Sequence, residues 1–448
     1  MRPGSCPRLP HMAEPRMAPH RAKSARRGPR IRRETFANGL RLVTEAMPHV
    51  RSVSIGVWLT RGSRHEPLEH AGIAHFVEHM LFKGTTTRTA EDIAQQVDSI
   101  GGQLDAFTSK EYAGYYVKVL DEHLPVAVDV LADLVSNPVF AREDIQREQK
   151  VVLEEIKMVE DTPDDLVHEI FAEAYWNGHP LGRPILGTPE SVSALDQASL
   201  QSYFSDTYVA SNFVVVAVGN LQHEAVRALV EQKLGATPAA GRDALDSVPV
   251  VQPSIEIRQK ELEQSHVCFG TVALPQNHPD RYAAYALNTV LGGSMSSRLF
   301  QNVRERRGLA YSVFSSLSAY QDVGALSIYA GCGNDAVEEL VDVVVAEIGH
   351  MCREPMPADE LRRAKDHLKG SLMLNLESTS SRMSHHARQE IYRDRADTLD
   401  EMLASIERVS VEEVQRLAAL FFDGQPLAVT VLGDVNGLAI TTEQLRIE

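Results

Sequence analysis

Two histidines and a glutamate, His75, Glu78 and His79, lie within five consecutive residues. On a helix, residues four apart lie one above the other, about 40° apart around the axis, so both imidazoles can reach one metal ion. Glu78 lies about one residue-step off that face, where its carboxylate can reach a metal-bound water without being forced to ligate the metal. The order H-x-x-E-H reverses the commoner zincin motif. This spacing predicts a hydrolytic zinc site.

A hydrolytic zinc site usually has three protein ligands and one open position for water. The helical stretch Arg142–Glu160 offers Glu148, Glu154 and Glu155 as the third ligand. Glu148 and Glu155 are two helical turns apart and share a face, where one carboxylate can bind the metal and the other can orient a histidine. Spacing alone does not choose Glu155 over Glu154, and a solvated acidic helix is the alternative interpretation.

The elements that must position these residues follow one another from Glu34 onward. Alternating apolar residues predict half-buried strands, and longer apolar periodicity predicts helices. The predicted strands cover residues 39–43, 53–59, 103–120 and 213–218, and the predicted helices cover residues 71–82, 124–135 and 143–160.

The order of strands and helices starts again after residue 254. The segment around Gly56 resembles that around Gly270, and the run ending at Gly219 resembles that ending at Gly433, both at an offset of 214 residues. The shared offset predicts two homologous domains, each a mainly antiparallel sheet with helices packed on it, in the α+β class. The predicted organisation is a tail (1–33), a zinc-binding domain (34–235), a linker (236–254) and a second domain (255–448). Shifting the histidine motif by 214 leaves no metal ligand there, so only the first domain is expected to bind zinc.

The net charge of −16 is unevenly distributed along the 448 residues. The predicted tail carries nine arginines and one lysine against one acidic residue, so the remainder has 35 basic and 60 acidic residues. An acidic body argues against nucleic acid as a partner and fits basic peptides or metal cations. No apolar stretch is long enough to cross a membrane.

The predicted tail has no apolar run typical of a secretory signal. Its composition resembles a mitochondrial presequence, but its prolines would interrupt an amphipathic helix. The alternatives are a true targeting segment, an unstructured tail or a start codon assigned too early. Four scattered cysteines indicate a reducing compartment. The predicted location is the cytoplasm, with the mitochondrial matrix as the alternative.

The histidine motif, with 75 residues between His79 and Glu155, resembles that of the pitrilysin-type inverzincins. Within this family the chain is most similar to the catalytic β-type subunit of mitochondrial processing peptidase and its one-chain bacterial relatives. The likeness extends from Glu34 to about Asp434 and includes residues 179–184, 292–301 and 304–312.

The resemblance implies a clamshell of two like domains with one Zn²⁺ per chain. It makes Glu155 the third zinc ligand, Glu148 an assisting carboxylate and Glu78 the general base. Arg304 and Tyr311 of the second domain would hold the substrate. The family's substrate-binding edge strand falls on Asp105, Ala106, Phe107 and Thr108, although many relatives carry Asn in place of Asp105.

The resemblance implies a zinc-dependent endopeptidase that cleaves unfolded peptides or N-terminal extensions, as a processing peptidase does. Two alternatives are a non-enzymatic core or assembly subunit and a catalytic subunit that needs a separate α-type partner. The expected partners are a basic or extended peptide and a second subunit, in a homodimer or in a heterodimer with a related chain. No nucleic acid partner and no membrane span are expected.

Overall fold

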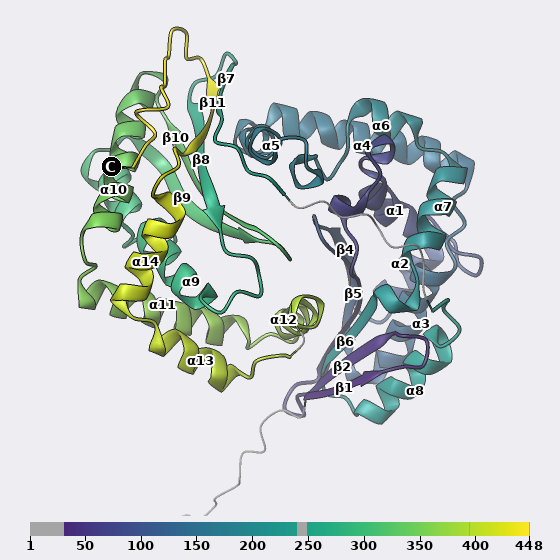
Figure 1. Ribbon diagram of the computed structural model, residues 1–448. Coiled ribbons are helices and arrows are strands. Elements are labelled where there is room, and N and C mark those ends of the chain that lie inside the picture. The colour runs from purple at the N-terminus through teal and green to yellow at the C-terminus, as the bar shows by residue number, and fades with distance from the viewer. Residues whose placement is uncertain (1–30, 240–248, 394, 448) are drawn as a thin grey trace, which may run out of the picture.

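A computed structural model describes residues 31–239, 249–393 and 395–447. The chain forms two sheets that face each other across the middle of the molecule, each with helices on its outer side (Figure 1). We refer to residues 31–239 as the first half and to residues 249–447 as the second half. The strands of the first sheet come from the first half, and those of the second sheet come from the second half.

The two sheets have the same strand order apart from one extra strand. The first sheet runs β1-β2-β6-β3-β5-β4 and the second runs β7-β11-β8-β10-β9. Only the pairs β2/β6 and β7/β11 are parallel among the described strands. The strands are β1 (Ile31–Thr35), β2 (Arg41–Ala46), β3 (Ser52–Leu59), β4 (Gln103–Thr108), β5 (Ala113–Leu120), β6 (Phe213–Gly219), β7 (Ile255–Gln259), β8 (Ser265–Ala273), β9 (Ala310–Ala319), β10 (Gly324–Cys332) and β11 (Ala428–Gly433). The predicted α+β class with mainly antiparallel sheets is confirmed.

Helices surround both sheets. In the first half they are α1 (Ile73–Leu81), α2 (Ala90–Asp98), α3 (Leu124–Ser136), α4 (Arg142–Asp161), α5 (Pro163–Trp176), α6 (Pro189–Ala194), α7 (Gln197–Thr207) and α8 (His223–Leu234). In the second half they are α9 (Arg281–Leu291), α10 (Val337–Arg353), α11 (Ala358–Asn375), α12 (Thr379–Tyr392), α13 (Leu399–Arg408) and α14 (Val411–Phe422). Short helical turns are η1 (Ser63–His65), η2 (Leu68–His70), η3 (Asp121–His123), η4 (Pro180–Gly182), η5 (Ala210–Asn212), η6 (Phe300–Arg306) and η7 (Asn334–Ala336).

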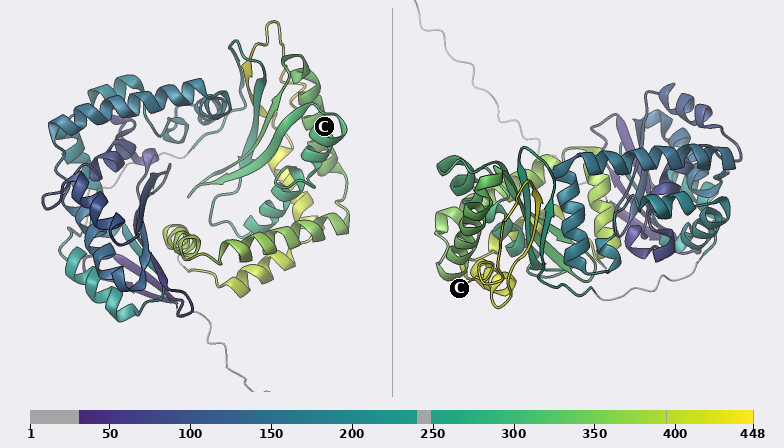
Figure 2. Two further views of the ribbon diagram at one scale, coloured as in Figure 1. Left: turned by 180° about the vertical axis from the view of Figure 1, so that it is seen from behind. Right: turned by 90° about the horizontal axis from the view of Figure 1, so that it is seen from above.

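Two helices, α5 and α12, cover the sheet of the opposite half. Helix α5 packs against β8 and β11, where Phe171 joins a buried cluster with Cys268 and Leu432. Helix α12 packs against β3 and β6, where Met383 is buried against Trp58. The two helices begin 216 residues apart (379 − 163), close to the repeat offset, so the exchange is reciprocal. Figures 1 and 2 show them at the two junctions between the halves.

A buried arginine in η1 adds ion pairs between the halves. Arg64 donates to Glu111 in the β4–β5 turn (2.8 Å) and to Asp322 in the β9–β10 turn (2.7 Å). Glu111 also accepts a hydrogen bond from the Tyr392 hydroxyl at the end of α12 (2.7 Å) and from the Gln321 N–H (3.0 Å). Because the Arg64 side chain is fully buried, these charges are compensated by one another rather than by water.

Two sequence-based expectations need correction. The single strand predicted over residues 103–120 is a hairpin of β4 and β5, because residues 109–112 form a turn. The predicted tail ended at residue 33, but β1 begins at Ile31 and pairs with β2. The rest of that tail and residues 240–248 of the predicted linker lie outside the described residues. Each helix of the described part is too short or too polar to span a bilayer.

Gly270 of β8 tests how tightly α5 is held on the second sheet. A Cβ atom at this position would lie 2.2 Å from Cζ of the Phe171 ring. We expect Gly270→Ala to lower the free energy of unfolding by about 1–3 kcal/mol, since the ring or the helix must shift. Gly370→Ala is the control: it lies in α11 with open space around it, and should stabilise by about 0.5–1 kcal/mol. Urea denaturation measures both, and equal effects would contradict this packing.

Arg64 tests the ion pairs between the halves. We expect Arg64→Ala to cost about 3–5 kcal/mol in the free energy of unfolding, because it leaves the Glu111 carboxylate buried without its cation. The control is Arg51→Ala, whose side chain is 80% exposed in its pair with Asp121 and should contribute less than about 1 kcal/mol. A loss at Arg64 no larger than that at Arg51 would refute a structural role for the buried pair.

Candidate active site

Helix α1 carries His75, Glu78 and His79, and its N-terminus is held in place by Glu66. The Glu66 carboxylate accepts the N–H groups of Gly72 and Ala74, each at 2.8 Å. Gly72 adopts φ +91°, and a Cβ there would lie 2.6 Å from the Leu186 carbonyl oxygen, so only glycine fits. Burial raises the pKa of Glu66 to about 8. Glu66 was not identified from the sequence, although an acidic residue shortly before a helix start is a usable signal.

The apolar face of α1 fixes the direction in which its histidines point. Ile73, Phe76, Val77 and Met80 are buried in the core of the first half. His75 and His79 lie on the other side, toward α4, which packs against α1. This arrangement follows from the helical spacing read in the sequence.

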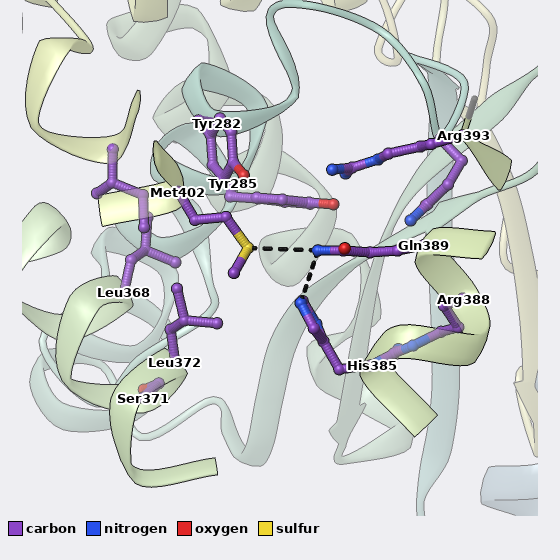
Figure 3. A pocket seen from close by; sticks show the side chains of 12 residues that line it. Tyr282, Tyr285, Leu368, Ser371, Leu372, His385, Arg388, Gln389, Arg393 and Met402 are labelled. Carbon is purple, nitrogen blue, oxygen red and sulfur yellow. Dashed lines mark hydrogen bonds between the residues drawn. The ribbon is translucent and has the colours of Figure 1, made fainter. Parts of the chain in front are cut away.

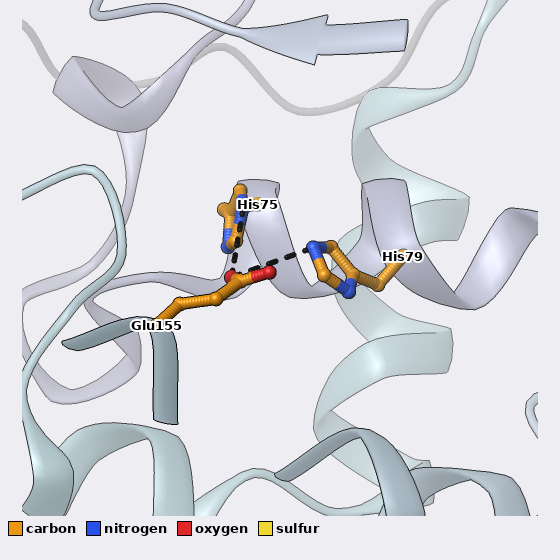
Figure 4. Close-up of side chains that lie close together, drawn as sticks. All are labelled: His75, His79 and Glu155. Atoms are coloured by element: carbon orange, nitrogen blue, oxygen red, sulfur yellow. Dashed lines mark ion pairs between the residues drawn. The ribbon is translucent and has the colours of Figure 1, made fainter. Parts of the chain in front are cut away.

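Glu155 of α4 lies between the two imidazole rings (Figure 4). Its Oε2 atom is 3.8 Å from His75 Nε2 and 3.7 Å from His79 Nε2. The three side chains form the one group in the described part of the chain whose ligand atoms all lie within 4.8 Å of one another. Glu154 points elsewhere: it is exposed and pairs with Lys157 at 2.7 Å. The geometry therefore selects Glu155, which spacing alone could not.

The donor set fits a zinc ion. Two imidazole nitrogens and one carboxylate oxygen are ligands that zinc commonly takes, and tetrahedral bonds place such atoms about 3.4 Å apart. Glu155 Oε2 is buried without a hydrogen-bond partner in the described structure, as expected of an atom that faces a cation. Burial and the neighbouring His79 lower the pKa of His75 to about 4, so the His75 ring is neutral and able to ligate.

Glu148 orients His79 from behind. The Glu148 Oε2 atom lies 3.1 Å from His79 Nδ1, and Lys83 Nζ lies 2.8 Å from Glu148 Oε1. A proton on Nδ1 then donates to Glu148 and leaves Nε2 free to face Glu155. His75 has no such support, because its buried Nδ1 lacks a partner among the described residues. Lys83 was not identified from the sequence, since the contact joins it to a residue 65 positions away.

Glu78 is oriented by the sheet edge. The Thr108 hydroxyl, in the last residue of β4, donates to Glu78 Oε2 at 2.5 Å. Burial raises the pKa of Glu78, while this hydrogen bond and His79 oppose the rise. A buried carboxyl with a raised pKa is better suited to accept a proton from water than an exposed one.

Strand β4 is an edge strand of the first sheet, because it pairs with β5 on one side only and ends the strand order. Asp105 is exposed and accepts the Tyr116 hydroxyl at 3.0 Å. Ala106 and Phe107 are half-buried, and the Phe107 ring lies against Tyr112 and Tyr116. Residues 105–108 therefore lead along the edge toward Glu78.

Arg304 and Tyr311 lie in the second half, in η6 and at the start of β9. The Arg304 guanidinium lies over the Tyr311 ring, 4.4 Å from its centroid, and the Tyr311 side chain is largely exposed. The structure brings these two residues together. Within the described residues, neither makes a hydrogen bond or ion pair with the histidines, Glu78 or Glu155.

Comparison with known proteins agrees with the fold. Residues 41–189 match the family described as Insulinase (Peptidase family M16), and residues 194–368 match the Peptidase M16 inactive domain. The first match contains the two histidines and Glu155. The second match ends before the exchanged helix α12 and includes no part of the histidine cluster.

Curated relatives carry the name zinc protease. The chain is 45% identical over 392 residues to the uncharacterized zinc protease YmxG of Bacillus subtilis, covering 88% of this chain and 96% of that protein. It is 42% identical over 421 residues to an uncharacterized zinc protease of Mycobacterium tuberculosis, covering 93% and 96%.

Solved structures share the fold at low sequence identity. A protease from Helicobacter pylori superimposes with a TM-score of 0.83 at 22% identity, covering 90% of this chain and 99% of that chain. A peptidase M16 inactive domain protein from Pseudomonas fluorescens gives a TM-score of 0.85 at 21% identity, covering 90% and 98%. From the two family matches and the extent of its likeness to the curated relatives, this chain belongs to peptidase family M16.

Proposed function

We propose that this chain is a zinc-dependent endopeptidase that hydrolyses extended, unfolded peptides. The observation that carries the proposal is the meeting of His75, His79 and Glu155, from two helices, around one point. Membership of a peptidase family whose relatives are named zinc proteases supports the same chemistry. One zinc ion per chain is expected, since the second half lacks the motif at the equivalent positions.

His75, His79 and Glu155 would hold the metal, and Glu148 keeps His79 in the correct tautomer. When bound, zinc supplies Lewis-acid chemistry: it polarises a peptide carbonyl and makes water a stronger acid. Glu78 accepts the proton of the attacking water and then passes it to the amine nitrogen of the departing product. Thr108 holds the Glu78 carboxylate in position for both transfers.

The free edge of β4 would bind the substrate as an added strand. Backbone pairing at an edge recognises extended conformation rather than sequence, which suits a peptidase of broad specificity. The edge leads to Thr108, which contacts Glu78, so a peptide paired there would pass the metal ligands. The exposed Asp105 and the acid excess of the chain favour a basic peptide.

Arg304 and Tyr311 would hold the peptide from the second half. Because the Arg304 guanidinium is stacked on the Tyr311 ring, the guanidinium N–H groups and the phenol hydroxyl can both donate hydrogen bonds to a peptide. The substrates that we favour are proteins with N-terminal extensions, which the chain would cleave off as a processing peptidase does. Assembly as a homodimer or with a related subunit, and a location in the cytoplasm, stay predictions.

Glu155 and its neighbour Glu154 provide a matched pair for testing the metal site. We expect Glu155→Gln to lose bound zinc and peptidase activity, because a neutral amide is a poor zinc ligand. Glu154→Gln should keep both, since Glu154 is exposed and pairs only with Lys157. Metal content by mass spectrometry and cleavage of a fluorogenic basic peptide, with and without chelator, measure the two properties. Zinc retained in Glu155→Gln at the level of Glu154→Gln would refute the ligand set.

Glu78 tests the proposed general base separately from metal binding. We expect Glu78→Gln to keep its zinc and to lose about 10²–10⁴-fold in kcat, because an amide cannot accept the proton from water. Activity of the unmodified chain alone is the reference. If the unmodified chain binds zinc but is active only with a second subunit, the alternative of a partner-dependent catalytic subunit holds. If the purified chain contains no zinc and is inactive, the alternative of a non-enzymatic core or assembly subunit is favoured instead.

A further inference from the structure

A cavity of about 280 Å³ lies inside the second half, separate from the proposed metal site. Its walls come from α9, α11, α12 and α13. Figure 3 shows His385 and Gln389 reaching into it from α12, with apolar side chains on one side and Arg388 and Arg393 on the other. It is slightly smaller than typical small-molecule pockets, which span roughly 300–1,000 Å³, so it suits a ligand of one or two residues.

The charged side of the cavity has an excess of positive charge. Arg281, just behind the wall, and Arg393 both donate to the single carboxylate of Asp397 at 2.6 Å. Arg388 makes no hydrogen bond or ion pair with a described residue, and none of the lining residues that the structure describes is acidic. Among the described residues, two of these three guanidinium groups share one carboxylate and the third, Arg388, pairs with none, which favours an anion in the cavity.

Two polar atoms in the wall lack hydrogen-bond partners among the described residues. The Gln389 side chain is buried, and its Nε2 donates to His385 Nε2 (2.7 Å) and to the Asp397 carbonyl (3.2 Å). These bonds fix the amide orientation and leave Oε1 as a buried acceptor without a donor among the described residues. The Tyr285 hydroxyl likewise has no hydrogen-bond partner in the described part of the chain. Burial raises its pKa, and the nearby Arg393 and Arg388 oppose the rise. A ligand that satisfies the wall needs an anionic acceptor and, close to it, an N–H donor.

The opposite wall is apolar. Leu368 and Leu372 of α11, with Met402 and Ile406 of α13, line it. An aliphatic side chain would be removed from water there, and the flexible methionine can adapt to its shape. The wall therefore selects for an apolar group beside the anion and the N–H.

We propose that this cavity binds the carboxyl-terminal residue of a peptide with an aliphatic side chain. The carboxylate would pair with Arg388 and the Tyr285 hydroxyl, the amide N–H would donate to Gln389 Oε1, and the side chain would lie against Leu368 and Leu372. Peptide hydrolysis produces such ends, so the source of the ligand rests on the proposed function, whereas the binding site itself does not.

The test uses N-acetyl-L-leucine and its amide, N-acetyl-L-leucinamide, with the full-length chain carrying Glu78→Gln. Isothermal titration calorimetry should show binding of the acid at least tenfold tighter than that of the amide, because only the acid carries the charge. N-acetylglycine, which lacks the side chain, should bind at least fivefold more weakly than N-acetyl-L-leucine. Heat of binding is read without hydrolysis, so the result is independent of whether the chain is a peptidase.

Variants assign the binding to this cavity. Arg388→Met should weaken the binding of N-acetyl-L-leucine at least tenfold. The variant should fold normally, because Arg388 makes no ion pair with a described residue that the change would break. The control is Arg362→Met on the exposed side of α11, where affinity should be unchanged. Leu372→Ala should weaken N-acetyl-L-leucine but not N-acetylglycine.

Three results would overturn the proposal. They are equal affinity for the acid and the amide, unchanged affinity in Arg388→Met, and acetate binding as tightly as N-acetyl-L-leucine. The last would show a simple anion site without recognition of a peptide end. Loss of peptidase activity in other variants has no bearing on these three measurements.

Discussion

The reciprocal exchange of α5 and α12 is the constraint on which the rest of the molecule depends. Each sheet has one face covered by helices of its own half, and on the other face a single helix from the opposite half packs on two of its strands: α5 on β8 and β11, and α12 on β3 and β6. Separating the halves would expose those packed surfaces to water, including Trp58 on the first sheet, Leu432 on the second and Phe171 of α5. The fully buried Arg64 adds a charge that only the joined halves can satisfy. The same junction joins the half that carries the candidate metal ligands to the half that carries Arg304 and Tyr311.

The metal site depends on a second, local constraint. Helix α1 has nine residues, too short for its own stability, so its place must be fixed by tertiary contacts. Glu66 fixes its first turn, its apolar face fixes its rotation, and α4 supplies both Glu155 and the carboxylate behind His79. Three carboxylates near two histidines repel one another without a cation, and Lys83 offsets only Glu148. This excess of negative charge favours binding of a divalent cation at the site.

Much of the architecture could be predicted because it follows from the local periodicity of apolar residues. The repeat offset of 214 found the equivalence of β3 with β8 and of β6 with β11, and the helical spacing placed His75 and His79 on one face. The hairpin of β4 and β5 was read as one strand because its turn, residues 109–112, contains no glycine or proline. The exchange of α5 and α12 was not predicted, since an apolar helix face shows that it will be covered but not by which sheet. Lys83 was missed for the same reason, because its partner Glu148 is set by tertiary packing and not by spacing. Glu66 differs, since its partners Gly72 and Ala74 are close in the sequence and its place before the helix was a usable signal.

Helix α12 lies between the proposed ligand cavity and the first sheet, which carries the edge strand beside the proposed active site. One face of the helix buries Met383 and Ala387 against the first sheet, and the other presents His385 and Gln389 to the cavity. Its last residue, Tyr392, donates a hydrogen bond to Glu111. Glu111 also pairs with Arg64, which lies two residues before Glu66. A movement of α12 along its axis must therefore break the Tyr392 hydrogen bond or carry Glu111 with it. Glu111 lies in the turn that follows β4, three residues after Thr108, whose hydroxyl donates to Glu78.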